Sequence, residues 1–132
     1  MRDIKFRGLS KDDEWIYGDL VHQAFDGILV HEVGIKKHGN YPVFVIPETV
    51  GQFTGLTDAN GVEIYEGDII KIGSTNDIPD YGVVKFIAPC FLIESESNGV
   101  EPFFSDDDED KIWFEVCGNI HQNPELITGD LK

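Results

Sequence analysis

The chain has 132 residues, of which 41% are hydrophobic and 27% are charged, a composition that favours one folded globular chain over a disordered one. Its formal net charge of −15 at pH 7 argues against direct binding of nucleic acid, because such a charge repels phosphate backbones. The sequence shows neither a signal-peptide pattern nor an apolar run of about 18 residues, so we expect a cytoplasmic protein that does not enter a membrane.

Short runs of alternating apolar and polar residues, separated by Gly, Asn, Asp and Pro, dominate the chain and predict an all-β fold with little helix. In chain order, strands are expected at Ile4–Arg7, Glu14–His22, Gly27–His31, Val43–Ile46, Gln52–Thr54, Asp68–Ile72, Tyr81–Ile87, Phe91–Ser95, Val100–Phe104 and Ile112–Ile120.

Turn residues fall between several of these strands. Lys11-Asp12-Asp13 is expected to join the first two strands, and Asn60-Gly61 to form a turn between Thr57 and Ile64. Asn98-Gly99 is predicted to form a type I′ turn, since both residues tolerate a positive φ. Pro47–Val50 and Asn123–Leu126 are predicted to form short helical turns, each with proline early in the turn.

The last strand has the clearest alternation. Ile112, Phe114, Val116 and Ile120 share one face, while Trp113, Glu115, Asn119 and His121 share the other. The first set is expected to line the core.

The charge changes near residue 56. Residues 1–55 hold six Lys/Arg and eight Asp/Glu, a charge of −2, whereas residues 56–132 hold four and seventeen, a charge of −13. We therefore expect two lobes within one domain. In the second lobe, Tyr65-Glu66-Gly67-Asp68 has the pattern of a diverging turn and Gly82–Phe86 that of the strand after it. This order predicts a small SH3-like barrel over 56–132, beside a strand-rich N-terminal lobe over 1–55.

Residue patterns for chemistry are absent or incomplete. Asp106, Asp108 and Asp110 match the start of a calcium loop, but Lys111 and Cys117 stand where glycine and glutamate are needed. The acidic run Asp106–Asp110 is therefore predicted to be a solvated loop, and the shorter Asp58–Glu63 segment fails the same test because its glycine comes too early.

Histidine and cysteine patterns give no metal or redox site either. His22, His31, His38 and His121 lack metal-ligand spacing, and Cys90 and Cys117 form no Cys-x-x-Cys pair. Both cysteines are expected to be free and half-buried in strands. We predict neither a cofactor nor a metal, and no catalytic residue.

Three segments carry a family resemblance. Ile46–Leu56 with Asp58–Ile70 is similar to the central signature of the YopX family, and Phe114–Leu126 is similar to its C-terminal part. Ile4–Gly8 resembles the family's first strand. The resemblance covers nearly the whole chain, although Cys117 stands where relatives more often carry an aliphatic residue.

The resemblance implies a protein of phage or prophage origin in Gram-positive bacteria, with no biochemical activity attached to the family. The residues that carry it are expected to act structurally, in turns and close packing. They are Pro47, Gly51, Gln52, Gly55, Asp58, Asn60, Gly61, Tyr65, Gly67, Asp68, Gly118, Asn119 and Pro124.

Fifteen aromatic residues are many for this length. Several are expected on partly outward strand faces, where they serve either a second packing layer or an interface: Trp15, Tyr17, Phe103, Phe104 and Trp113. We predict a symmetric homo-oligomer that uses the near-neutral N-terminal lobe, through Ile4–Arg7, including Phe6, and through Trp15–Val21.

Three classes of function remain open from the sequence. The leading hypothesis is a non-enzymatic protein-interaction module whose partner is a host or phage protein with a basic surface. The second is an acidic nucleic-acid mimic that blocks a DNA-binding protein through Asp106–Asp110. The third is a hydrolase or nucleotide-binding enzyme whose site is built from residues far apart in the sequence.

Overall fold

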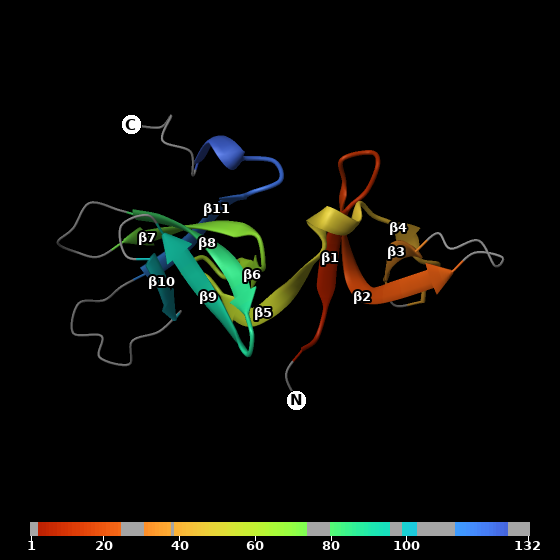
Figure 1. Ribbon diagram of the computed structural model, residues 1–132, viewed down its shortest axis with the longest axis horizontal. Coiled ribbons are helices and arrows are strands. Elements are labelled where there is room, and N and C mark those ends of the chain that lie inside the picture. The colour runs from red at the N-terminus through yellow and green to blue at the C-terminus, as the bar shows by residue number, and fades with distance from the viewer. Residues whose placement is uncertain are drawn as a thin grey trace. The chain divides into compact units, whose positions relative to one another are not determined.

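The structure, a computed structural model, describes residues 3–24, 31–37, 39–73, 80–95, 99–102 and 113–126. Within these ranges the chain forms eleven strands, two short 3-10 turns and no α-helix, which confirms the all-β prediction (Figure 1). The chain divides into two compact units, Met1–Gly55 and Leu56–Lys132. The division falls where the charge changes from −2 to −13.

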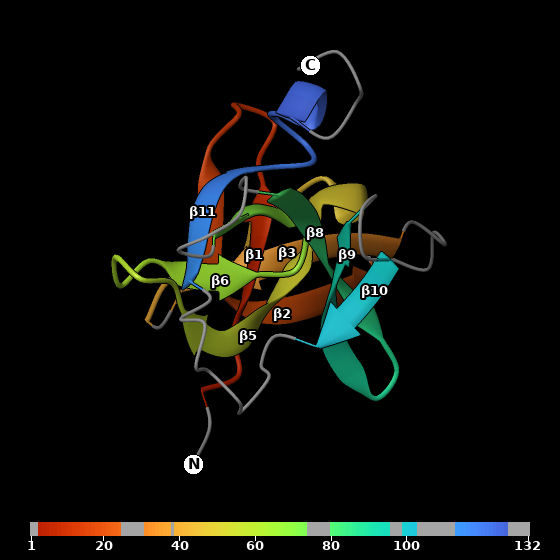
Figure 2. The ribbon, with the colours of Figure 1, turned by 90° about the vertical axis from the view of Figure 1, so that its left-hand side faces the viewer.

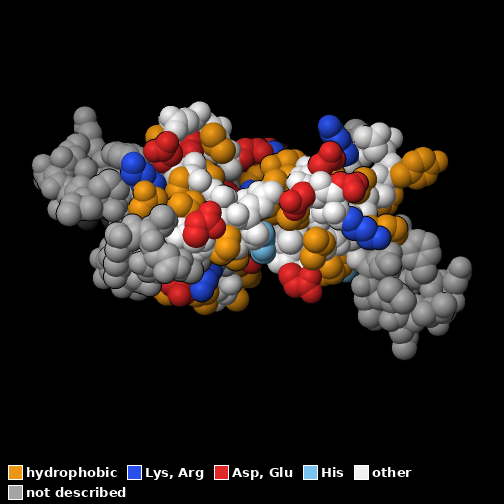
Figure 3. Space-filling model, turned by 90° about the horizontal axis from the view of Figure 1, so that it is seen from above, with side chains coloured by type: hydrophobic (Ala, Val, Ile, Leu, Met, Phe, Trp, Pro, Cys, Tyr) orange, Lys and Arg blue, Asp and Glu red, His pale blue; other side chains and the backbone are white. Residues whose placement is uncertain are grey.

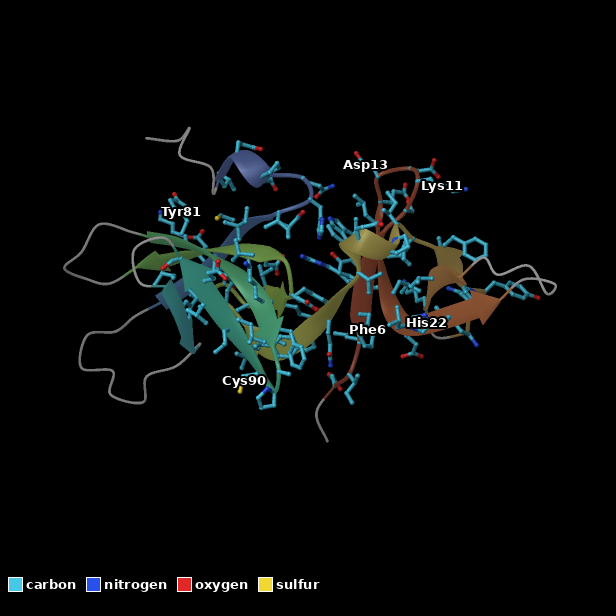
Figure 4. All side chains as sticks on the ribbon, in the orientation of Figure 1. Phe6, Lys11, Asp13, His22, Tyr81 and Cys90 are labelled. Atoms are coloured by element: carbon cyan, nitrogen blue, oxygen red, sulfur yellow. The ribbon has the colours of Figure 1, made fainter. Side chains whose placement is uncertain are left out.

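The first unit is an antiparallel sheet in the order β4-β3-β2-β1-β5, and the next strand of the same sheet is β6 (Glu63–Tyr65). Its elements are β1 (Phe6–Leu9), β2 (Trp15–Ala24), β3 (His31–Lys36), β4 (Val43–Phe44), the 3-10 turn η1 (Pro47–Thr49) and β5 (Gly51–Thr57). The predicted turn at Lys11–Asp13 joins β1 to β2, and Figure 4 shows Lys11 and Asp13 at its tip. The helical turn predicted at Pro47 is confirmed as η1.

The core of the first unit rests on close approach between β1 and the segment after β4. Leu9, Ile35 and Val45 are buried. Gly8 faces Val45 so closely that a Cβ on Gly8 would lie 2.6 Å from Val45 Cγ2. Thr49 links η1 to β1, because its Oγ1 donates to the Ile46 carbonyl at 2.6 Å and accepts from the Leu9 N–H at 2.8 Å.

The second unit contains a five-stranded antiparallel sheet in the order β10-β9-β8-β7-β11. Figure 2 shows β8, β9 and β10 of this sheet next to one another. Ile64, Ile70, Val84 and Ile93 form its buried core, and Phe91, Phe114 and Val116 are among the side chains that pack against them. The elements are β6 (Glu63–Tyr65), β7 (Asp68–Gly73), β8 (Asp80–Ile87), β9 (Cys90–Ser95), β10 (Gly99–Pro102), β11 (Trp113–Asn119) and the 3-10 turn η2 (Pro124–Leu126). The helical turn predicted after Asn123 is confirmed as η2.

The expected SH3-like barrel is not confirmed. In the described residues neither sheet closes on itself, because one order ends in β4 and β6 and the other in β10 and β11. The diverging turn and the glycine-led strand on which the barrel was predicted are present, as the β6–β7 turn and as β8. The turn therefore joins strands of two different open sheets, and β8 lies in the second of them.

Some strand boundaries were wrong. The third strand was expected at Gly27–His31, whereas β3 begins at His31 and continues to Lys36, and residues 27–30 lie outside the described residues. β1 begins at Phe6, so Ile4 precedes it. Gly99 pairs with Ser95 and so belongs to β10 and not to the turn expected at Asn98-Gly99, while Asn98 lies outside the described residues.

β11 contains a β-bulge that changes which side chains face the core. Val116 pairs with Ile70 and Gly118 with Ile69, so one additional residue, Cys117, is inserted in β11. The insertion shifts the alternation. Phe114 and Val116 face the core as predicted, but Asn119, expected on the outer face, is buried.

Candidate functional site

Asp58 is a buried carboxylate whose oxygens accept three backbone hydrogen bonds. Its Oδ1 accepts from the N–H groups of Asn60 and Val62, both at 2.8 Å, and its Oδ2 accepts from Val116 in β11 at 3.0 Å. Burial by itself would raise the pKa of Asp58, but the three N–H donors outweigh burial, so the pKa lies below its ordinary value of 3.8. The Asn60-Gly61 turn is held by this carboxylate and by the Gly61 N–H, which donates to the Asp58 carbonyl at 3.0 Å.

The β6–β7 turn is built from the next group of signature residues. Asp68 is buried and its Oδ2 accepts from the Tyr65 N–H at 2.7 Å. Gly67 has φ 91°, a conformation that glycine adopts without strain. Its N–H donates to Val84 at 2.8 Å and its carbonyl accepts from Ile120 at 2.9 Å, so this turn connects β8 to the segment after β11.

Asn119 organises the end of β11. Its Oδ1 accepts from the N–H groups of His121 and Gln122, both at 3.0 Å, and its own N–H donates to Asn123 Oδ1 at 3.3 Å. Gly118 leaves room for that amide, because a Cβ there would lie 2.6 Å from Asn123 Oδ1. Pro124 then opens η2.

The signature residues of the first unit lie at the junction of β1, η1 and β5. Pro47 begins η1. Gly51 and Gln52 pair with Arg7 and Phe6 on β1. Gly55 has φ 90° and no neighbouring atom within 4 Å of a Cβ built on it, so glycine is favoured there by backbone conformation and not by crowding.

The β8–β9 hairpin ends in an exposed apolar tip. Every residue from Lys85 to Cys90 is exposed, and the five from Phe86 onward, Phe-Ile-Ala-Pro-Cys, are apolar. Phe86 and Ile87 are 48% and 46% exposed. Figure 4 shows Cys90 at this end of the hairpin, far from Tyr81 at the other end. We call residues 86–90 the hairpin tip.

A second exposed apolar segment comprises β4 and the two residues on each side of it. Tyr41, Val43, Phe44 and Ile46 are all exposed, with Tyr41 at 92%, and only Val45 among residues 43–46 is buried. Hydrophobic side chains lie at the surface of both units in the view of Figure 3. We call residues 41–46 the edge segment.

The amino-acid sequence of this chain matches a known family. The YopX protein family matches residues 5–128. The chain belongs to the YopX family. No curated protein matches the chain. The crystal structure of protein EF1440 from Enterococcus faecalis is similar to it with a TM-score of 0.53 and 22% sequence identity, over 96% of this chain and 99% of that chain.

The YopX signature residues in this chain brace turns. The carboxylates of Asp58 and Asp68 both accept backbone N–H donors, an arrangement that stabilises a turn. Among the described residues, no three His, Cys, Asp or Glu side chains come together as a metal site.

The cysteines of this YopX protein are free in the structure, but both are exposed, so the expected half-buried position was wrong. The Cys117 Sγ donates to the Ile69 carbonyl at 3.4 Å. Although Cys117 as a whole is exposed, its sulfur contacts the strand backbone and is partly desolvated, which raises the pKa of the thiol, and the negative charge of Glu115 raises it further, so this thiol stays protonated at neutral pH.

The residues predicted to form an interface are only partly at the surface. Ile4 and Tyr17 are exposed, and Phe6 and Trp15 are half-buried. The Arg7 guanidinium lies over the Trp15 ring, 4.3 Å from its centroid. The Trp113 side chain, Phe103, Phe104 and the acidic run 106–110 lie outside the described residues.

Sequence reasoning missed the hairpin tip and the exposed face of the edge segment. Both segments are apolar, and an apolar run beside a strand is usually read as core. One signal was available for the tip. Ala88-Pro89 interrupts an apolar run with a turn that contains no polar residue, which is unusual for a surface turn. The described residues contain no apolar helix of membrane-spanning length.

Proposed function

We propose that this YopX protein is a non-enzymatic protein-interaction module that contacts its partner through the hairpin tip. The observation that supports this most directly is the run of five consecutive exposed apolar residues, Phe86 to Cys90. Such a run on a solvent-facing turn has no role in the core of the sheet that carries it, and exposed apolar runs commonly mark contact sites.

The hairpin tip is held in a fixed shape. The Phe86 and Phe91 rings lie 5.1 Å apart between centroids at 57°, and Phe91 packs against the core of the second unit. Beside the tip, Lys85 Nζ and Glu94 Oε2 form an ion pair at 2.9 Å across the same two strands. An ordered apolar surface loses little conformational entropy on binding, which favours affinity.

The partner we propose is a protein with an apolar pocket bordered by Lys and Arg. The hairpin tip belongs to residues 56–132, which carry −13. That charge opposes the docking of two such units on each other and attracts a basic surface. A basic partner with an apolar pocket would be attracted by the negative charge of this unit and would bury the hairpin tip.

The test uses Ile87→Ser, with Val62→Ser as the matched control, because Val62 is 48% exposed, lies in the same unit and is far along the chain from the tip. A photo-crosslinking residue at position 87 captures the partner, which is then purified and titrated against each variant. We expect Ile87→Ser to raise the dissociation constant at least tenfold and Val62→Ser to change it less than twofold. Equal effects of both variants, or a captured protein without a basic surface, would overturn the proposal.

The nucleic-acid-mimic alternative predicts a different dependence. It is carried by Asp106–Asp110, so neutralising these acids would abolish binding while Ile87→Ser would leave it unchanged. The same titration therefore separates the two functions.

A further inference from the structure

The edge segment carries a second surface that the proposed partner contact does not use. Four large apolar side chains are exposed within six consecutive residues, Tyr41 at 92%, Val43 at 42%, Ile46 at 41% and Phe44 at 37%. Val43 and Phe44 are neighbours in β4 and so point to opposite faces of the sheet. Exposure of both means that β4 presents apolar groups on each face at the end of its sheet.

The backbone of the edge segment is anchored, so these side chains form an ordered surface. β4 pairs with β3 through Ile35–Val43 and Gly34–Phe44. Beyond β4, the Val45 N–H donates to Val33 at 3.1 Å and the Ile46 N–H donates to Leu9 at 2.8 Å. The segment is also held down by Val45, which is buried against Gly8.

The charges in and around the edge segment indicate that a second copy of the chain could cover this surface. The edge segment contains no charged residue, and the unit around it carries only −2. A second copy of the chain can therefore meet it there through an uncharged surface. Exposed basic residues, Lys36 and Lys37, precede the segment, and an exposed acid, Glu48, follows it. Two copies packed antiparallel about a two-fold axis place the basic flank of one beside the acidic flank of the other.

We infer that the edge segment is the contact of a two-fold symmetric homodimer, in which Tyr41, Val43, Phe44 and Ile46 of one copy pack on the same residues of the other. An isologous contact of this kind is self-complementary and closes at two copies. It also covers the β4 edge, which would otherwise remain open at the end of the sheet. The inference is independent of the proposed partner contact, because it uses the other unit.

The experiment measures molar mass by light scattering and by sedimentation equilibrium at 5 to 200 µM, a concentration range on the order of that used for weak dimers. We expect wild-type mass near twice 14.8 kDa at the upper concentration. Val43→Asp places like charges together at the two-fold axis and should weaken the dimer at least thirtyfold. Tyr41→Ser should weaken it at least fivefold, and since Tyr41 is almost fully exposed, this variant remains informative if Val43→Asp does not fold.

Ile4→Asp is the matched control. Ile4 is 57% exposed in the same unit and belongs to the surface that the sequence predicted for self-association, so the control also compares the two locations. We expect it to leave the dimer unchanged. A monomer of wild-type protein at all concentrations, or dissociation by Ile4→Asp but not by Tyr41→Ser, would overturn the inference.

The flanking charges give a second readout. Glu48→Lys puts like charges beside each other across the two-fold axis and should weaken the dimer about threefold, a size typical of exposed ion pairs. Combining it with Lys36→Glu and Lys37→Glu reverses both flanks and should restore the wild-type dissociation constant. If the combined variant stays as weak as Glu48→Lys, the antiparallel arrangement is wrong.

Discussion

At the scale of single residues, Asp58 joins parts of the second unit that are 58 residues apart along the chain, since it binds its own turn and also Val116 in β11. Charge-assisted hydrogen bonds to buried backbone donors contribute more than neutral ones. Removing the carboxylate leaves three N–H groups without this acceptor.

We predict that Asp58→Ala lowers the free energy of unfolding by about 3 kcal/mol, the cost expected when buried donors lose a charged acceptor. Asp58→Asn keeps an oxygen for Asn60 and Val62 but turns an NH2 group toward Val116, so its cost should be about half as large. Urea unfolding followed by tryptophan fluorescence measures both. The control is Asp12→Ala, in the exposed β1–β2 turn, and a cost for Asp58→Ala no greater than for this control would contradict the prediction.

The same carboxylate makes stability depend on pH. Its pKa is lower in the folded protein than its ordinary value of 3.8, so the folded state favours the ionised form. The stabilisation is therefore fully present above the unfolded pKa and is lost as pH falls through the folded pKa. We expect the stability difference between wild type and Asp58→Asn to be constant from pH 7 to about pH 5 and to shrink below about pH 4. A difference that grows on acidification would show that the folded pKa is not depressed.

At the scale of elements, the packing of β1 on the segment after β4 depends on a missing side chain. We predict that Gly8→Ala destabilises the protein by about 2 kcal/mol, because the new methyl meets the stiff, branched side chain of Val45. In a Val45→Ala background the same change should cost about half as much, because the two Cγ atoms are removed while the Val45 Cβ, 2.8 Å from the new methyl, remains. A double-mutant cycle by urea unfolding tests this, and additive costs would contradict it.

Local patterns predicted most turns and strand identities but not the strand order. Asn60-Gly61 and Gly67-Asp68 were recognised because glycine at positive φ and an aspartate that binds nearby N–H groups act locally. β3 was misplaced because Gly34 in its interior weakens the strand pattern. In the structure a Cβ at this glycine would lie 3.3 Å from Pro42 Cβ, so the close approach of β4 favours a small residue there.

The candidate surfaces could not be predicted for a related reason. Val43–Ile46 was recognised as apolar and strand-forming, but whether such a strand is central or at an edge depends on pairings made by distant parts of the chain. The bulge at Cys117 is likewise a feature of how β11 pairs with the distant strand β7. Residues that act through long-range pairing leave little local signal.

At the scale of the whole molecule, the uneven charge predicts opposite salt dependence for the two proposed contacts. Salt screens the interaction between exposed charges that are more than about 8 Å apart at 0.15 M, or more than about 3 Å apart at 1 M. Binding of a basic partner by the −13 half should weaken as salt rises. The dimer brings together two chains of −15 through an uncharged segment. Because salt screens the repulsion between the two chains, the dissociation constant of the dimer should fall as salt rises. Both dissociation constants can be measured, by sedimentation and by partner titration, at about 0.05 and 0.5 M NaCl, on either side of the physiological ionic strength. If salt changed the two constants in the same direction, this account would be contradicted.

The strand order also decides when each unit can finish folding during synthesis. The first five strands of the six-stranded sheet end by Thr57 and only β6, at its edge, follows them, so most of that sheet can assemble while the rest of the chain is still being made. In the second unit, β7 must wait for β11, since Phe114 pairs with Ile72 across more than forty intervening residues. Until β11 leaves the ribosome, the β7 edge beside Ile70 and Ile72 is open to any strand that reaches it. The second unit is therefore where a chaperone or a neighbouring nascent chain would most readily intervene.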